Sequence, residues 1–205
     1  MKKLIFIILI FLQSASIYSQ LHKDLSFELR YPIPLGNNFI NKAFDNGYSG
    51  IIDLGVDYSV IRYGKFSVGL TFNSALFRMS ETDVTLWTLT PKIKVDFNVD
   101  FNKLSVIPRL GIGYSNWRTY AMMQYTNDSQ EPTGTFLEKT IQNGLSVQAS
   151  TKVLIKNNKK INWFIQLAYE FTKLEKPEAP AIDSKYNRNI HLVYPGIGLI
   201  WNFRK

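Results

Sequence analysis

The sequence has no cysteine and only two histidines among its 205 residues. The lack of cysteine excludes a disulfide scaffold, a cysteine-ligated zinc site, a thiol nucleophile and a lipid anchor on an N-terminal cysteine. Charged residues make up 20% and hydrophobic residues 45%, which is too apolar for a disordered chain and too polar for a bundle of membrane helices. After the first stretch, no apolar run approaches the roughly 20 residues of a spanning helix.

The N-terminus has the pattern of a secretory signal peptide. Lys2 and Lys3 precede an unbroken apolar run over residues 4–12, and small residues follow it. That run is too short to span a bilayer as a helix. We therefore predict a signal peptide at residues 1–19, cleaved before Gln20, and one exported domain over residues 20–205.

Beyond Asp24, apolar and polar residues alternate with a period of two, which is typical of strands with two different faces. The pattern predicts strands at about 24–33, 50–62, 66–78, 87–98, 104–118, 139–155, 161–173 and 189–203. Eight consecutive strands without a helix predict an all-β fold, an eight-stranded antiparallel up-and-down barrel. Pro91, Pro108 and Pro195 fall inside these strands, and we expect bulges or strand ends there, because proline cannot donate a ladder hydrogen bond.

The predicted connections differ between the two ends of the barrel. Residues 34–49, 119–138 and 174–188 form long loops at one end, whereas the turn at 63–65 and the connections 99–103 and 156–160 are short. Short turns and long loops at opposite ends are typical of outer-membrane barrels. In the longest loop, Tyr120, Met122, Met123 and Tyr125 could form a contact surface, or they could extend the strand pair above the membrane.

Alternation alone leaves open which face is outside, because a soluble lipocalin-like barrel shows the same period with its apolar face inward. Several predicted strands exceed the 9–11 residues that cross a bilayer, which favours the membrane. Aromatic residues near both strand ends also favour it, since such rings form girdles at membrane interfaces. The predicted girdle contains Tyr31, Phe66, Trp87, Phe97, Trp117, Trp163, Trp201 and Phe203.

The polar face then predicts a narrow lumen in which charges of both signs pair with each other, as buried charges require. Glycines on this face leave space for the charged side chains. The predicted lumen network contains Glu28, Arg30, Asp53, Asp57, Lys92, Lys94, Asp96, Arg109, Lys152 and Glu170.

The alternating C-terminal run consists of Val193, Ile197, Leu199, Trp201 and Phe203. With it, the mature chain resembles the small eight-stranded outer-membrane β-barrel proteins of Gram-negative bacteria, in the porin-like superfamily. The resemblance implies that the barrel-assembly machinery recognises the last strand. It also implies contact with outer-membrane lipid and lipopolysaccharide. The family includes structural proteins, adhesins, small-ligand binders and a few lipid A-modifying enzymes.

No constellation of residues predicts catalysis. Lipid A deacylases of similar architecture place a histidine and a serine two residues apart, but the residue two after His191 is Val193. Asp183 and Ser184 could approach His191 from the preceding loop. Asp53 and Asp57 are about 13 Å apart along one strand, too far for a glycosidase pair.

Cofactors and nucleic acid are not predicted either. Asp128, Glu131 and Glu138 are close in sequence but lack the spacing of an EF-hand, so we expect no metal site. The lysines are dispersed over turns and strand ends, which does not favour nucleic-acid binding.

We therefore predict an integral outer-membrane barrel, without cofactor, that has a structural or loop-mediated binding role and is not a bulk-flow pore. The alternatives are an outer-membrane lipid-modifying enzyme that uses His191 and a soluble secreted lipocalin-like ligand-binding barrel.

Overall fold

The computed structural model describes residues 24–36, 48–79, 85–126, 132–156, 160–175 and 188–202. The predicted signal peptide at residues 1–19 lies outside these ranges and stays a prediction. Among these residues the structure contains no helix with the length and hydropathy of a membrane span.

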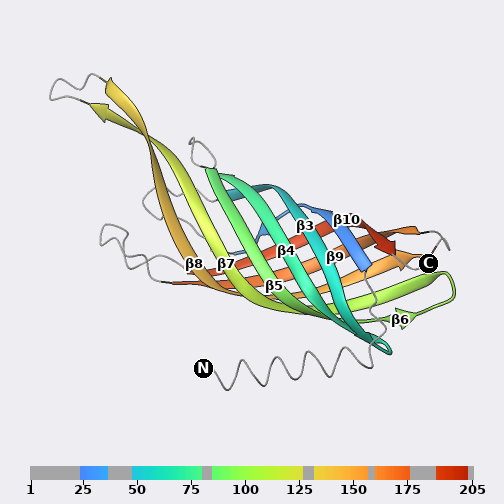
Figure 1. The fold of residues 1–205 in the computed structure, drawn as a ribbon. Coiled ribbons are helices and arrows are strands. Elements are labelled where there is room, and N and C mark those ends of the chain that lie inside the picture. Colours follow the sequence, from blue (N-terminus) through green and yellow to red (C-terminus); the bar gives the residue numbers. More distant parts are fainter. Residues whose placement is uncertain are drawn as a thin grey trace, which may run out of the picture.

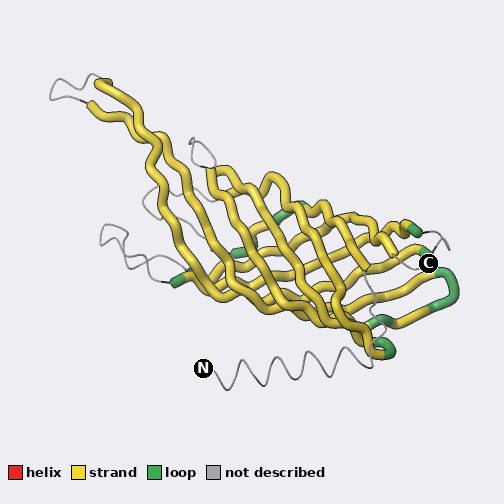
Figure 2. Tube along the Cα trace, in the orientation of Figure 1, coloured by secondary structure: helices red, strands yellow, loops and turns green. Residues whose placement is uncertain are grey.

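Long strands account for nearly all of the described residues (Figures 1 and 2). In chain order they are β1 (Asp24–Arg30), β3 (Tyr48–Tyr63), β4 (Phe66–Met79), β5 (Thr85–Phe97), β7 (Leu104–Thr126), β8 (Pro132–Ile155), β9 (Ile161–Leu174) and β10 (Asn189–Asn202). Two short strands, β2 (Ile33–Pro34) and β6 (Val99–Asp100), pair with β10 and β7 respectively.

Every long strand pairs antiparallel with its neighbours in the chain, and the sheet closes on itself. The closing seam joins β1 to β10, from Asp24 opposite Asn202 to Arg30 opposite Gly196. Because β1 also pairs with β3, the eight long strands leave no open sheet edge around the barrel. The predicted eight-stranded antiparallel barrel is confirmed.

The turn between β3 and β4 is tight, as predicted. Tyr63 pairs with Phe66, so only Gly64 and Lys65 make the turn. Gly64 has a φ of 57°, in the left-handed region that two-residue hairpin turns require and that glycine adopts without a Cβ clash.

The predicted loop at 119–138 is wrong over most of its length. Strands β7 and β8 continue as a paired ribbon up to Thr126 opposite Pro132 (Figure 1). Only residues 127–131, which contain the polar turn sequence, lie outside the described strands. The ribbon forms because two strands can continue their own ladder after their other neighbours have ended. Of the two alternatives predicted for this segment, a loop surface or an extended strand pair, the backbone forms the extended strand pair.

The three prolines cause no register shift. The described register shifts lie between Gly50 and Ile52, between Ser59 and Ile61, and at the tip of the ribbon. Pro108 and Pro195 lie just where the β5–β7 and β1–β10 ladders end, at Asp96–Arg109 and at Arg30–Gly196. Pro91 lies in an interruption of the β5–β7 ladder, between Leu89–Asn116 and Lys92–Gly113. The missing proline N–H is therefore placed where a neighbouring ladder stops or is interrupted, and bulges are not needed.

Candidate functional site

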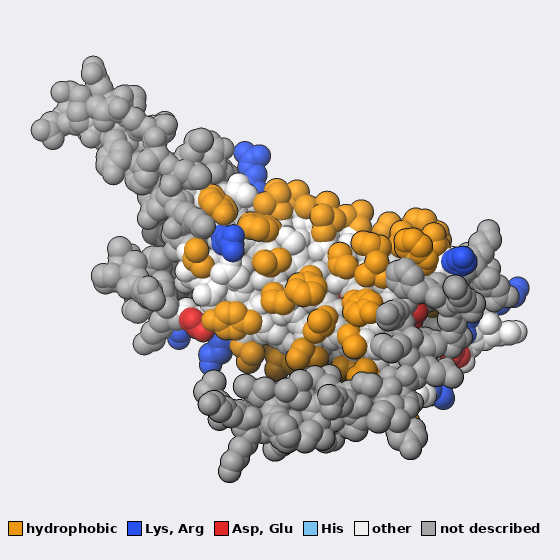
Figure 3. Space-filling view, viewed as in Figure 1, with side chains coloured by type: hydrophobic (Ala, Val, Ile, Leu, Met, Phe, Trp, Pro, Cys, Tyr) orange, Lys and Arg blue, Asp and Glu red, His pale blue; other side chains and the backbone are white. Residues whose placement is uncertain are grey.

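The outer face of the barrel is apolar. Leu110 is 66% exposed, Leu167 59% and Ile165 57%, and orange side chains cover the middle of the visible face in Figure 3. On β9, the outward side chains are apolar or aromatic from Ile161 to Phe171. Ten residue steps cover about 33 Å along the strand, or about 25 Å along the barrel axis at a tilt of about 40°. This height equals the apolar band of a transmembrane barrel.

A polar belt borders this band at the loop end. The Trp87 indole N–H donates to Ser74 Oγ at 2.6 Å, and the Arg118 guanidinium lies 5.0 Å above the Trp87 ring. Arg118 also donates to the Asn116 side chain, which donates to Asn143 at 2.6 Å. The hydrogen bonds and the cation–π contact together link β4, β5, β7 and β8 at the border of the apolar band.

Most residues of the predicted aromatic girdle point outward near the strand ends. Tyr31, Phe66, Trp163 and Trp201 are between 43% and 54% exposed. Trp87 and Phe97 are half-buried, and Phe97 packs on Phe66 with 4.8 Å between ring centroids. Phe203 lies outside the described residues.

Trp117 is the exception, and its prediction as a girdle residue is wrong. Its side chain is only 3% exposed and points into the barrel, because it shares the parity of the inward-facing Ser115.

All ten residues of the predicted lumen network are buried inside the barrel, each no more than 6% exposed. In the half nearer the turns, Asp57 is the central acceptor. Its Oδ2 lies 2.7 Å from an Arg109 nitrogen and 2.6 Å from Lys152 Nζ. Arg109 also pairs with Asp96, which accepts from Lys94 Nζ at 2.7 Å.

Glu28 connects this group to the rest of the network. Its carboxylate contacts Arg109 and Lys152 on one side and lies 3.7 Å from Arg30 on the other. Arg30 in turn donates to Asp53 at 2.7 Å.

Lys92 and Glu170 form a further ion pair of the network. The Lys92 ammonium also donates hydrogen bonds to the side chains of Asn73 and Gln148.

The network is balanced in charge. Five of its members are cations (Arg30, Lys92, Lys94, Arg109 and Lys152) and five are anions (Glu28, Asp53, Asp57, Asp96 and Glu170). Because each buried charge has an oppositely charged partner within 4.0 Å, the interior carries no uncompensated formal charge from these ten groups.

Glycines on the inner face make room for large side chains. A Cβ on Gly198 would lie 2.3 Å from the Phe164 ring and 2.3 Å from the backbone oxygen of Phe27. Phe164 therefore fills the interior over Gly198, and Lys152 Nζ lies 4.3 Å from the centre of its ring.

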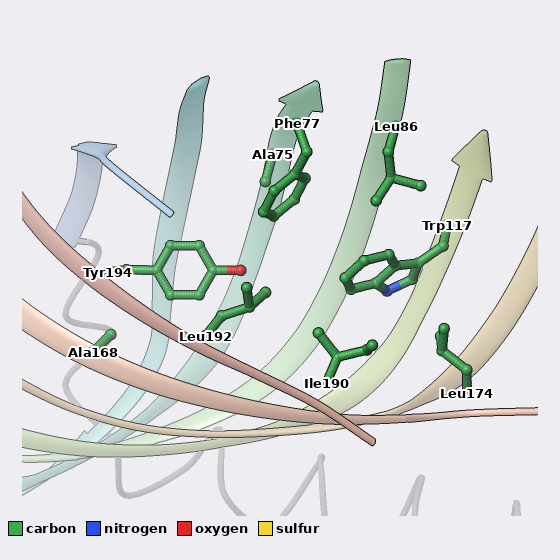
Figure 4. Close-up of a cluster of buried hydrophobic side chains, with 9 residues drawn as sticks. All are labelled: Ala75, Phe77, Leu86, Trp117, Ala168, Leu174, Ile190, Leu192 and Tyr194. Carbon is green, nitrogen blue, oxygen red and sulfur yellow. The ribbon is translucent and has the colours of Figure 1, made fainter. Parts of the chain in front are cut away.

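Toward the loop end, the interior becomes apolar. Phe77 and Trp117 stack with 5.8 Å between ring centroids, and Leu192 and Tyr194 face them across the barrel (Figure 4). This apolar plug consists of Ala75, Phe77, Leu86, Trp117, Ala168, Leu174, Ile190, Leu192 and Tyr194. Arg30 lies 4.6 Å from the Tyr194 ring, where the plug meets the charged network.

Sequence reasoning missed this plug, although a signal was present. Phe77 shares the parity of Asn73, and Tyr194 that of Gly198, so both belong to the inward face. The sequence prediction describes the inner face as polar, whereas in the structure this face becomes apolar toward the loop end.

At the turn end, the interior opens into a cavity of about 370 Å³. Buried Lys94, Arg109 and Lys152 form part of its wall, and Arg62, Asp100 and Lys156 line it near the turns. The Lys156 ammonium lies 2.5 Å from Asp100, and this hydrogen bond holds the pKa of the Asp100 carboxyl below its usual value. The plug lies at the other end of the barrel, so the described walls form a dead-end cavity.

His191 lies on the outer face near the loop end. Its Nδ1 is 2.6 Å from the Tyr169 hydroxyl, and its ring centre is 5.1 Å from that of Phe171. Asp183 and Ser184 lie outside the described residues, as do Asp128 and Glu131. Among the described residues, no three His, Cys, Asp or Glu side chains come together as a metal site.

A closed barrel with an apolar outer band and a charged, paired interior is the architecture of a transmembrane β-barrel. A soluble lipocalin-like barrel requires the opposite arrangement, with charges outside and an apolar cavity, so this structure does not support that alternative.

Comparison with solved structures agrees with this class. The fold is similar to that of Neisserial surface protein A, with a TM-score of 0.51 and 11% identity over 88% of this chain and 97% of that chain. Also similar are Ail of Yersinia pestis (TM-score 0.47, 16% identity, 88% and 99% covered) and the N-terminal barrel of OprF of Pseudomonas aeruginosa (0.46, 8%, 88% and 98%). No protein-family model and no curated protein matches the chain. The chain has the fold of the small eight-stranded outer-membrane barrels.

Proposed function

We propose that this protein is an integral outer-membrane barrel, a closed scaffold that presents its loop end and the β7–β8 ribbon outside the membrane. The observation that carries the proposal is the inverted distribution of side chains. The apolar residues face outward over about 25 Å, whereas ten balanced charges fill the inside.

The same interior argues against a bulk-flow pore. Eight strands enclose a space that side chains fill. Here the salt-bridged network crosses the middle of the lumen and the apolar plug fills its loop end (Figure 4). Passage of solutes would require breaking both layers.

We propose two kinds of membrane contact. At the loop end, the outward side chains of Arg78, Arg118 and Lys173 lie at the border of the apolar band, where they suit the phosphates of lipopolysaccharide. The last strand carries the alternating residues by which the barrel-assembly machinery would recognise the chain, and export would depend on the signal peptide.

We propose no catalytic role. His191 faces outward and contacts Tyr169 and Phe171, so it belongs to the aromatic surface near the membrane border. The expected result is that His191→Ala leaves the lipid A profile of expressing cells unchanged. A changed acylation pattern would instead support the lipid-modifying alternative.

The experiment that tests the scaffold is electrophoresis of the membrane fraction with and without boiling. A folded barrel in the outer membrane is expected to migrate faster when unboiled. Recovery in the soluble fraction, without a mobility difference, would contradict the proposal. The same purified protein is expected to give no stable conductance steps in planar bilayers. Large, persistent steps would contradict the closed lumen but not the barrel.

A further inference from the structure

The β7–β8 ribbon leaves the barrel with two free edges. Among the described residues, β5 pairs with β7 no further than Tyr120, and β9 pairs with β8 only from Gly144 onward. Asn143 O also accepts from the Glu175 N–H, and from there to the tip β7 and β8 form a ladder only with each other within the part of the chain that the structure describes. The ribbon extends well beyond the polar belt, since the eight residue steps from Arg118 to Thr126 cover about 26 Å.

The two edges differ in sequence. The β8 edge, residues 132–142, contains Pro132, Gly134, Glu138 and Lys139. Proline and charged residues are the means by which proteins prevent an edge strand from pairing with another chain.

The β7 edge, residues 121–125, reads Ala-Met-Met-Gln-Tyr. It has no charge, proline or glycine, and its ladder with β8 is regular over all five residues. One edge of the ribbon is therefore protected against strand addition and the other is not.

We propose that the β7 edge is a homotypic docking strand, which pairs antiparallel with the β7 edge of a second copy on a facing membrane. The proposal rests on the membrane-embedded orientation proposed above.

The direction of β7 in the barrel favours a second copy on a facing membrane as the partner of this edge. Two free edges can meet around a twofold axis perpendicular to the sheet, and the strands are then antiparallel. Strand β7 runs from the turn end of the barrel to the loop end, so in every copy it points away from its own membrane. Two such strands are antiparallel when their membranes face each other, and parallel when both stand in one membrane.

The residues of the β7 edge are also compatible with antiparallel pairing to the same residues of a second copy. Around a twofold axis at Met123, this residue lies opposite its own copy, Met122 lies opposite Gln124, and Ala121 lies opposite Tyr125. No pair brings like charges together, which would be destabilising in an antiparallel ladder. Five residues give weak pairing for one contact, but many copies on two membranes add avidity.

The test uses the full mature chain in phosphatidylcholine vesicles, with clustering followed by light scattering. Wild-type vesicles are expected to cluster. Met123→Lys and Met123→Glu are each expected to reduce clustering to the level of protein-free vesicles, because each places like charges opposite one another at the twofold axis. Vesicles with Met123→Lys mixed with vesicles with Met123→Glu are expected to cluster again.

The matched control is Phe136→Lys. Phe136 is the ladder partner of Met123, so the new charge is at the same height but on β8. It is expected to leave clustering at the wild-type level. Dispersed wild-type vesicles, undiminished clustering of both Met123 variants, or a mixture that stays dispersed would each overturn the proposal.

Electrophoresis of boiled and unboiled samples of the same vesicles distinguishes failure of the docking strand from failure of the membrane scaffold. A barrel that shows the mobility difference but does not cluster overturns only the docking strand. A chain without the mobility difference overturns the membrane scaffold itself.

Discussion

Substitution of Asp57 by Asn tests whether the balanced charges hold the barrel together. Asp57 Oδ2 accepts from Ser26 Oγ at 2.8 Å, Arg109 at 2.7 Å and Lys152 at 2.6 Å. The amide keeps the shape of the side chain but removes the charge, so the interior changes from neutral to a net charge of +1.

The magnitude follows from these contacts. At an effective dielectric constant of about 20, one pair of charges at about 2.7 Å attracts with about 6 kcal/mol before desolvation is counted. Removing one partner of a buried pair costs about 3–5 kcal/mol net, because the remaining cations stay buried. We therefore expect Asp57→Asn to lower the free energy of unfolding by about 3–5 kcal/mol.

The assay is reversible urea unfolding in lipid vesicles, read from tryptophan fluorescence and from the mobility of unboiled samples. Lys152→Met is expected to cost about as much as Asp57→Asn, since it leaves one anion in excess. The double variant restores neutrality and is expected to recover at least about 2 kcal/mol relative to the sum of the two single variants.

Asp100→Asn is the control for this series, because Asp100 is exposed at the turns and its partner Lys156 is only half-buried. We expect that variant to cost less than about 1 kcal/mol. An Asp57→Asn variant within about 0.5 kcal/mol of wild type, or costs that simply add in the double variant, would refute the argument that charge balance stabilises the interior.

Three further outcomes follow from the structure. Leu110→Arg, in the outer band, should cost about 2–4 kcal/mol in vesicles, and an unchanged stability would contradict the lipid-facing assignment. Trp117→Ala in the plug should cost about 3–5 kcal/mol in urea unfolding, without conductance in planar bilayers, because the charged network remains beneath it. Conductance steps would show instead that the plug alone closes the lumen. The Asp100 pair contributes stability above the ordinary carboxyl pKa of 3.8 and loses it as pH falls through the lowered folded pKa. The difference between wild type and Asp100→Asn should therefore be present at neutral pH and disappear in strong acid, and a difference that grows in acid would contradict this sign.

The barrel itself was predictable because strand alternation is a local property. Glu28 and Arg30 on one strand, and Lys92, Lys94 and Asp96 on another, share a parity with small residues and oppose apolar neighbours. This alternation in a chain without predicted helices predicts strands with two different faces. The long and short connections at opposite ends and the aromatic residues near the strand ends then favour the charged face inside.

The extent of the strands was less predictable. The turn residues near position 128 indicate a connection, but not where pairing stops on either side of it. Pairing to Thr126 depends on β7 and β8 supporting each other after β5 and β9 have ended, which is a property of the assembled sheet.

The order of the amino acids is enough to show which residues share a face, since side chains alternate along every strand. Which charges pair depends on the folded barrel, because closure brings distant strands to opposite walls. Lys152 and Asp57 are 95 residues apart, and Arg109 and Glu28 are 81 apart, yet each pair is in contact. The height of each residue along the barrel axis, which separates the apolar plug from the charged network, also comes from the tertiary structure. Parity gives a face but no height, and the height depends on the stagger of eight strands around a closed sheet.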